Sequence, residues 1–91
     1  MIRSPFHPGR FLRKLLAEHS ISQTRLAKHI GVQIGVINQI CMEKRGISPK
    51  MAIKLSHALG TTPEFWLNLQ TAYELNRTDL KRSIKPLVRV A

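Results

Sequence analysis

The sequence has little cysteine, few acidic residues and no long apolar run, and each shortage narrows the classes of protein to which it can belong. A single cysteine, Cys41, excludes a disulfide within the chain and fits a reducing compartment. Because Cys41 lies in an apolar stretch, we expect a small core residue rather than a reactive thiol. No apolar run approaches the roughly 20 residues of a membrane span, and the start, MIRSPFHPGR, lacks the apolar region of a signal peptide. We therefore expect a cytoplasmic protein.

The acidic residues are too few and too scattered to suggest a paired general acid and base. The histidines have no cysteine or acid at metal-ligand intervals, and no glycine-rich loop is present to hold a phosphate group. We therefore expect no catalytic residue, no metal site, no cofactor and no enzymatic activity. The four histidines are His7, His19, His29 and His57.

Basic residues dominate the charge. The 91 residues include 15 Lys and Arg against 5 Asp and Glu, which gives a net charge of +10 and an isoelectric point near 11.0. Residues 1–76 carry ten basic and four acidic residues, so this part is basic without residues 77–91. Such a charge suits a phosphate-bearing partner, although a merely solvated surface would give the same count. A chain of this length fits one domain with a modest core. Dimerisation would add to the stability of so small a domain.

The stretch from Ser22 to Ile40 carries the clearest structural signal. Ser22 is a good N-cap, and the segment SQTRLAKHIG keeps its apolar residues on one helical face up to Gly31, a typical helix end. A second apolar face begins at once in VQIGVINQI, where we expect Val36, Ile37 and Ile40 in the core. Two helices joined so tightly predict a helix-turn-helix, a layout that presents its second helix to a DNA groove.

Start and stop signals predict three further helices, over residues 8–19, 49–59 and 63–76. The expected architecture is therefore all-α, with five short helices. We expect residues 1–76 to form the domain, with its last helix used for dimerisation, and residues 77–91 to form a basic C-terminal tail. The β-type alternation around Pro86 leaves two alternatives for this tail, one short strand or no regular structure.

The chain resembles the lambda-repressor-like (XRE) helix-turn-helix proteins in its order of helices and in several residues. These are Gln23, Leu26, Ala27, Gly31, Val32, Ile37, Lys44, Arg45 and the segment ALGTTPEFW. More narrowly, HPGRFLRKLL and RGISPKMAIKLSHALGTTPEFWLNLQTAYEL resemble the HigA/VapI-type antitoxins, over about residues 7–76. This resemblance implies a cytoplasmic, usually dimeric protein that binds its own operator and neutralises a toxin. In the HigB group, this toxin is a ribonuclease that cleaves mRNA.

The resemblance also implies a DNA-binding surface. Gln23 would bind the DNA backbone at a helix N-terminus, and the third helix would enter the major groove. Asn and Gln can bond adenine at two points, and each such contact gives roughly 1–3 kcal/mol of discrimination. The DNA-binding residues expected on this basis are Gln23, Arg25, Lys28, Gln33, Ile34, Gly35, Asn38, Gln39, Lys44 and Arg45.

Several positions depart from the pattern of the family. Ile34 and Val36 stand where relatives commonly carry arginine or serine, and Met42-Glu43 stands where they commonly carry Asn-Gly. Glu43 would place a negative charge near the DNA backbone. Gly35 weakens the third helix by roughly 0.5–1 kcal/mol relative to alanine. We therefore expect affinity to depend mainly on phosphate contacts, with modest sequence discrimination.

The last predicted helix is richer in apolar residues than a small bundle needs. These residues either complete the core of one protomer or contact a second copy, where aromatic side chains are enriched. We expect a mixture of the two, hence a homodimer, with half-sites roughly 34 Å apart on the DNA. The expected dimerisation residues are Phe65, Trp66, Leu69 and Tyr73.

The leading functional hypothesis is a DNA-binding repressor that is also the antitoxin of a HigB-like toxin. Two alternatives remain open at this point. One is an interaction module that neutralises a toxin while its DNA binding is weakened. The departures from the family pattern at Ile34, Val36, Met42 and Glu43 favour this alternative. The other is a stand-alone regulator without a toxin.

Overall fold

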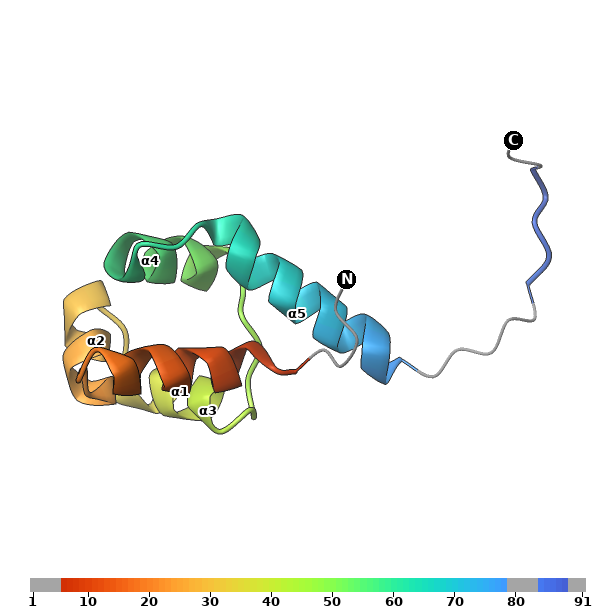
Figure 1. Ribbon diagram of the computed structural model, residues 1–91. Helices are drawn as coiled ribbons and strands as arrows, with labels where there is room; N and C mark the ends of the chain where they lie inside the picture. Colours follow the sequence, from red (N-terminus) through yellow and green to blue (C-terminus); the bar gives the residue numbers. More distant parts are fainter. Residues whose placement is uncertain (1–5, 79–83, 89–91) are drawn as a thin grey trace.

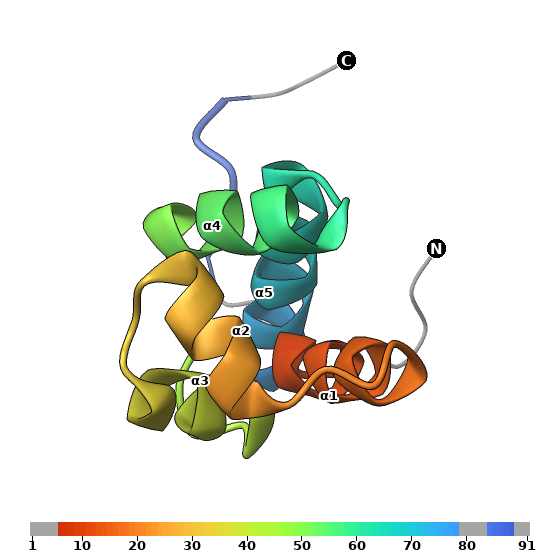
Figure 2. The same ribbon diagram turned by 90° about the vertical axis from the view of Figure 1, so that its left-hand side faces the viewer.

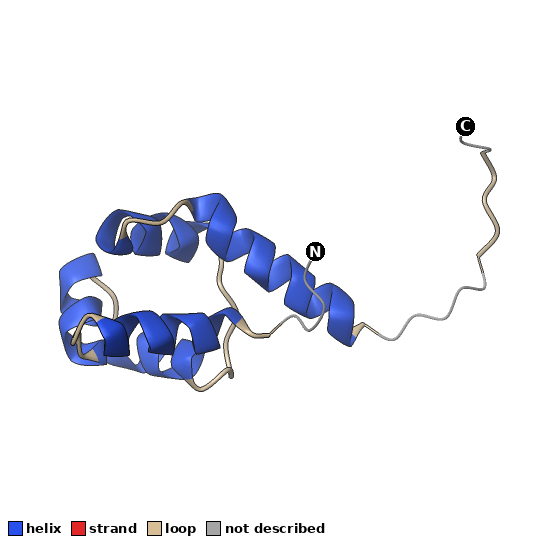
Figure 3. Ribbon diagram, viewed as in Figure 1, coloured by secondary structure: helices blue, strands red, loops and turns tan. Residues whose placement is uncertain are grey.

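The computed structural model describes residues 6–78 and 84–88. In these ranges the chain forms five α-helices and no strand (Figures 1 and 3). None of these helices is long and apolar enough to cross a membrane. The helices are α1 (Pro8–Glu18), α2 (Gln23–Ile30), α3 (Ile34–Cys41), α4 (Pro49–Leu59) and α5 (Pro63–Arg77). The all-α, five-helix prediction is confirmed.

Side-chain caps fix where the helices begin. The hydroxyl oxygens of Ser22, Ser48 and Thr62 each accept a hydrogen bond from the backbone nitrogen three residues on, at 3.0–3.1 Å. Such a cap satisfies a backbone donor that the first turn of a helix leaves without a partner. Proline opens α1, α4 and α5, where its missing N–H costs nothing. Each of these starts follows from local sequence.

Left-handed residues end four of the helices. Gly31 and Gly60 close α2 and α4 at φ values of 73° and 71°, which glycine adopts without steric cost. Ser20 and Glu43 take the same conformation after α1 and α3, at φ values of 55° and 63°. For a residue with a Cβ atom this conformation costs on the order of 1 kcal/mol.

One hydrophobic core joins all five helices. Leu12 of α1, Ile37 and Ile40 of α3, Leu55 of α4 and Trp66 of α5 have no exposed surface. Figure 2 shows α4 lying across α2, with α3 beside α2 and α5 crossing behind them. Cys41 is also buried, as predicted. Because α3 is held through its inner face, its outer face remains free.

Helices α1 and α3 approach each other closely at Gly9. A Cβ atom at this position would lie 1.8 Å from the carbonyl oxygen of Ile40, so only glycine fits. His7, Pro8 and Gly9 therefore have three separate structural roles at the start of α1. His7 caps the helix, Pro8 opens it, and Gly9 admits the end of α3.

The structure corrects one prediction about the C-terminal part and decides between two alternatives for residues 84–88. Helix α5 continues to Arg77, one residue past the predicted boundary at position 76, since Thr78 supplies the capping contacts to Glu74 and Leu75. Of the two alternatives for the tail, residues 84–88 show no regular structure and are exposed. The rest of the tail lies outside the described residues.

Candidate nucleic-acid interface

Helices α2 and α3 each expose polar side chains on the side away from the core. On α3, Gly35, Asn38 and Gln39 are exposed, whereas Ile37 and Ile40 on the opposite face are fully buried. The predicted DNA-facing residues of α3 thus share its free side, together with Ile34, which is 45% exposed. On α2, Arg25 and Lys28 are exposed too. Lys44 and Arg45 lie in the exposed segment that follows α3.

The side chains of Gln23 and Asn38 are bonded to each other. The Asn38 Nδ2 atom donates to the Gln23 Oε1 atom at 3.2 Å, joining the first turn of α2 to the middle of α3. The bond leaves the amide nitrogen of Gln23 and the amide oxygen of Asn38 available for other partners. This pair therefore orients two amide groups on one surface.

A second pair joins Gln39 to Arg45. The Arg45 Nε atom donates to the Gln39 Oε1 atom at 2.8 Å. The guanidinium is thereby held beside α3, although its remaining N–H groups are still able to donate. Neither pair follows from the sequence alone, because both need the turn geometry that brings the partners together.

Arg13 of α1 binds the end of α3. Its guanidinium donates to the backbone carbonyl of Cys41 and lies 3.3 Å from the carboxylate of Glu43. Two backbone bonds, from Glu43 to Ile40 and from Lys44 to Gln39, close the same helix end. Glu43, which stands where relatives commonly carry glycine, therefore has both a conformational and an electrostatic consequence. A glutamate occupies a left-handed position that glycine would fill freely, and Arg13 partly neutralises its charge.

The segment after α3 is anchored to α5 by Gln70. Its Oε1 atom accepts from the backbone nitrogen of Ile47 at 2.8 Å, and its Nε2 atom donates to Glu74 at 2.9 Å. Gly46 makes room for this side chain, since a Cβ atom there would lie 2.8 Å from the Gln70 amide. The positions of Lys44 and Arg45 thus depend on α5 as well as on α3.

His7 links the start of α1 to α5. Its Nδ1 atom accepts from the backbone nitrogen of Gly9 at 2.9 Å, and its ring meets the Tyr73 ring edge-on at 4.9 Å. Burial lowers the pKa of His7 below its ordinary value, and the nearby Glu43 carboxylate opposes this effect in part. The capping role needs the neutral imidazole, because a protonated Nδ1 atom cannot accept a hydrogen bond.

The predicted dimerisation residues of α5 divide into two groups. Trp66 is wholly buried, packs against Phe11 and Phe65, and donates its Nε1 hydrogen to Thr61 at 2.6 Å. A side chain without exposed surface cannot contact a second copy, so the assignment of Trp66 to a dimer contact is wrong. Phe65, Leu69 and Tyr73 are half-buried and keep some surface for a partner. Their place in a dimer stays a prediction.

Sequence reasoning missed two residues that support this surface, Arg13 and Gln70. Arg13 stands on an ordinary amphipathic helix and gave no signal. Gln70 lies within the segment TTPEFWLNLQ, which resembles the antitoxin family, but its role there depends on packing between α5 and the segment after α3. Within the described residues, no three His, Cys, Asp or Glu side chains gather in a way that could hold a metal ion.

Comparison with known proteins agrees with this geometry. A helix-turn-helix family model matches residues 12–66. Virulence-associated protein A′ of Dichelobacter nodosus is 42% identical over 77 residues, covering 84% of this chain and 67% of the relative. The structure of the antitoxin GraA in complex with its operator is 40% identical, with a TM-score of 0.82 and 94% of both chains covered. The structure of the Pseudomonas aeruginosa antitoxin HigA with the higBA promoter is also 40% identical, with a TM-score of 0.78, and covers 93% of this chain and all of that one.

Proposed function

The chain belongs to the XRE-type helix-turn-helix family, and from this premise we propose that it is a dimeric repressor that binds its own operator. We further propose that it is the antitoxin of a HigB-like, mRNA-cleaving toxin. The function is binding rather than catalysis, in the cytoplasm, where operator DNA and toxin are both accessible. Similar proteins of known structure include the antitoxin GraA in complex with its operator and the antitoxin HigA with the higBA promoter.

One observation carries the DNA-binding part of the proposal. The Gln23–Asn38 pair holds two amide groups on the free side of the helix-turn-helix, at a separation of 3.2 Å. Amides are the side chains that bond adenine at two points in the major groove. Gln23 also stands at the first position of α2, where the backbone N–H groups of a helix favour a phosphate oxygen. Asn38 would then read a base while Gln23 binds the backbone.

Basic residues around this pair would supply the sequence-independent part of the affinity. We propose that Arg25, Lys28, Lys44 and Arg45 contact phosphates. Gln33, Ile34, Gly35 and Gln39 would lie in the groove, with Ile34 able to meet only a thymine methyl group.

The dimer and the domain limits are parts of the same proposal. We propose that residues 1–76 act as the DNA-binding and dimerisation domain and that residues 77–91 act as a basic tail. Phe65, Leu69 and Tyr73 would contribute to the dimer contact, without Trp66. A two-fold dimer would bind half-sites roughly 34 Å apart.

A second candidate function is favoured by the apolar side chains on the side of α3 that we propose faces DNA. Ile34 is 45% exposed and Met42 is 53% exposed, and Glu43 adds a negative charge beside them. An antitoxin that binds its toxin but recognises DNA weakly would tolerate such a surface. A regulator with no toxin is the remaining alternative, and a toxin gene beside this one would argue against it.

The decisive experiment compares binding to the DNA upstream of the gene with binding to a scrambled duplex, over a series of salt concentrations. The expected result is a preference of about a thousandfold at physiological salt, typical of specific recognition. Asn38→Ala and Gln39→Ala should each reduce this preference, whereas Lys14→Ala on the exposed side of α1 should not. Equal binding to both duplexes that falls steeply with salt would leave only electrostatic attraction and favour the second candidate.

A further inference from the structure

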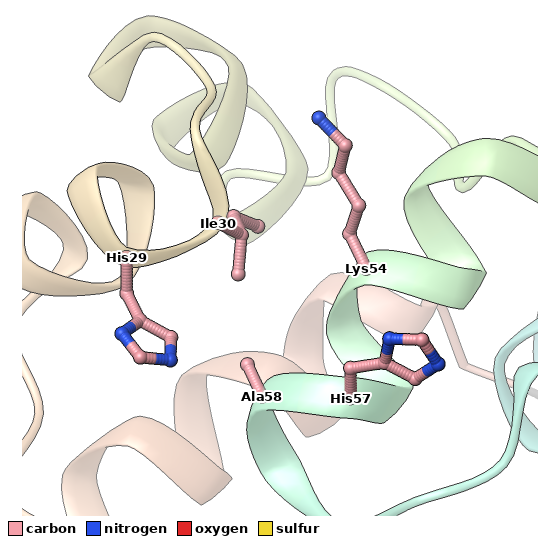
Figure 4. Close-up of a pocket in the computed structure, with 5 residues that line it drawn as sticks. All are labelled: His29, Ile30, Lys54, His57 and Ala58. Carbon is pink, nitrogen blue, oxygen red and sulfur yellow. The ribbon is translucent and has the colours of Figure 1, made fainter.

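A groove runs between α2 and α4, away from the Gln23–Asn38 pair. Its central hollow has a volume of about 260 Å³ and is lined by His29 and Ile30 from α2 and by Lys54, His57 and Ala58 from α4. Figure 4 shows His29 and Ile30 on the α2 side of this hollow and Lys54, His57 and Ala58 on the α4 side. The hollow is open to solvent, and no side chain of residues 6–78 or 84–88 fills it.

Two further hollows extend this one in both directions. Toward the start of α2, a hollow of about 100 Å³ shares His29 and Ala58 with the central one and adds Ile21 and Leu59. Toward the start of α4, a hollow of about 310 Å³ shares Lys54. Because neighbouring hollows share lining residues, they form one continuous surface, which we call the α2–α4 groove.

The floor of the groove is apolar. Ile21, Ile30, Ala58 and Leu59 are partly buried and pack against the core while keeping exposed surface toward the groove. At the other end, Val36 has the same character. Such a floor favours apolar side chains of a ligand, since burying them releases roughly 25 cal/mol per Å².

The rim of the groove is basic. The polar side chains that line it include Arg25, His29, Lys50, Lys54 and His57. Within the part of the chain that the structure describes, no Asp or Glu lines any of the three hollows. A ligand that covers this groove therefore meets the positive charges of Arg25, Lys50 and Lys54 at its edges and no carboxylate of the described residues.

We propose that the α2–α4 groove binds an acidic amphipathic helix of a partner protein. The apolar face of such a helix, with side chains at positions i, i+3, i+4 and i+7, lies on the floor, and its carboxylates reach the basic rim. Nucleic acid satisfies only half of this description, since a phosphate backbone pairs with the rim but has no side chains for the apolar floor. The inference goes beyond the proposed operator surface, with which the groove shares only Arg25 at its rim, and it does not depend on operator binding.

The test uses the full chain and a fluorescein-labelled synthetic peptide with leucine at i, i+3, i+4 and i+7 and glutamate at most other positions. Fluorescence anisotropy measures its affinity. The expected result is saturable binding that Lys54→Glu and His57→Glu each weaken by about tenfold, because each replaces an attractive rim contact by a repulsive one. Lys14→Glu, which makes the same charge change on exposed α1, should have less than about a twofold effect.

Four outcomes would overturn the proposal. The first is no saturable binding of the peptide. The second is an equal loss of affinity for Lys14→Glu and Lys54→Glu, which would show attraction to overall charge rather than to the groove. The third is equal binding of a peptide with the same composition but with its leucines spread around the helix. If Lys54→Glu instead weakens binding of a non-operator DNA duplex and leaves peptide binding unchanged, the groove is a phosphate surface and the proposal is wrong.

Discussion

The side-chain oxygen of Gln70 accepts a hydrogen bond from the backbone nitrogen of Ile47 at 2.8 Å, joining α5 to the segment that follows α3. The segment carries Lys44 and Arg45, which we propose as phosphate contacts. Through this one bond, the helix proposed for dimerisation also positions residues proposed to bind DNA. The bond gives the two functions a shared structural element.

Gln70→Ala should weaken operator binding by about threefold to tenfold, equivalent to roughly 0.6–1.4 kcal/mol. The substitution leaves the part-buried nitrogen of Ile47 without its partner and frees the segment to move. Anisotropy with operator DNA measures the effect. Glu74→Gln serves as the control, because it retains an oxygen that can accept from the Gln70 amide. Wild-type affinity in Gln70→Ala would show that Lys44 and Arg45 are held in place without this bond.

Glu43→Gly should strengthen operator binding while leaving the free energy of unfolding within about 1 kcal/mol of the wild type. Glycine removes the cost of the left-handed conformation at φ 63°, which offsets the loss of an exposed ion pair with Arg13. It also removes a negative charge close to the proposed phosphate contacts. Urea denaturation and anisotropy separate the two effects. Glu43→Gln keeps the backbone cost and should gain DNA affinity without gaining stability; a loss of affinity in both variants would contradict this account.

Gly9→Ala should destabilise the fold by about 1–3 kcal/mol or more, as overpacking does. The new Cβ atom would lie 1.8 Å from the Ile40 carbonyl oxygen, so α1 and α3 must move apart. The matched change is Gly35→Ala, where nothing lies within 4 Å of the added atom. There we expect a gain of about 0.5–1 kcal/mol from the higher helix propensity of alanine. Denaturation curves for both variants test the pair, and equal effects would refute the packing explanation.

Stability should fall as the pH drops below about 6.5, the ordinary pKa of histidine. Burial holds the pKa of His7 in the folded protein below that value, so the unfolded chain binds the proton more readily and acid favours unfolding. The loss grows until the pH reaches the lower pKa of the folded state. Urea denaturation between pH 7.5 and about 5 measures it.

His7→Asn is the informative variant for this pH dependence. Asparagine is a good N-cap that does not titrate in this range, so the decline below pH 6.5 should shrink. His19→Gln replaces an exposed histidine and should leave the decline unchanged. If the decline is the same in His7→Asn and the wild type, another group is responsible for it.

Helix positions were predictable because their signals are local. Ser22, Ser48 and Thr62 cap the helices that follow them, and Gly31 and Gly60 end helices, each through contacts within a few residues. The period of the apolar residues likewise identified which side of α3 faces the core. These features depend on neighbours along the chain and not on the packing of the whole domain.

The contacts that shape the candidate site were not predictable in the same way. The partners Arg13 and Glu43 are 30 residues apart, and Gln70 and Ile47 are 23 residues apart. Whether such residues meet depends on the angles between packed helices, which the apolar pattern leaves undetermined. Trp66 illustrates the limit, because an aromatic residue at a suitable spacing fits a core and an interface equally well. The packing of Phe11 and Phe65 against Trp66 shows that its side chain belongs to the core.

The division of α3 into two sides has a practical consequence. Ile37, Ile40 and Cys41 fasten the helix to the domain from within, and Gly9 sets its distance from α1. The outward positions 34, 35, 38 and 39 bear none of this packing, so they can be randomised together in a library without repacking the domain. The inner residues of α3 must therefore be kept for folding, whereas the outward positions can be changed to obtain recognition of a new operator.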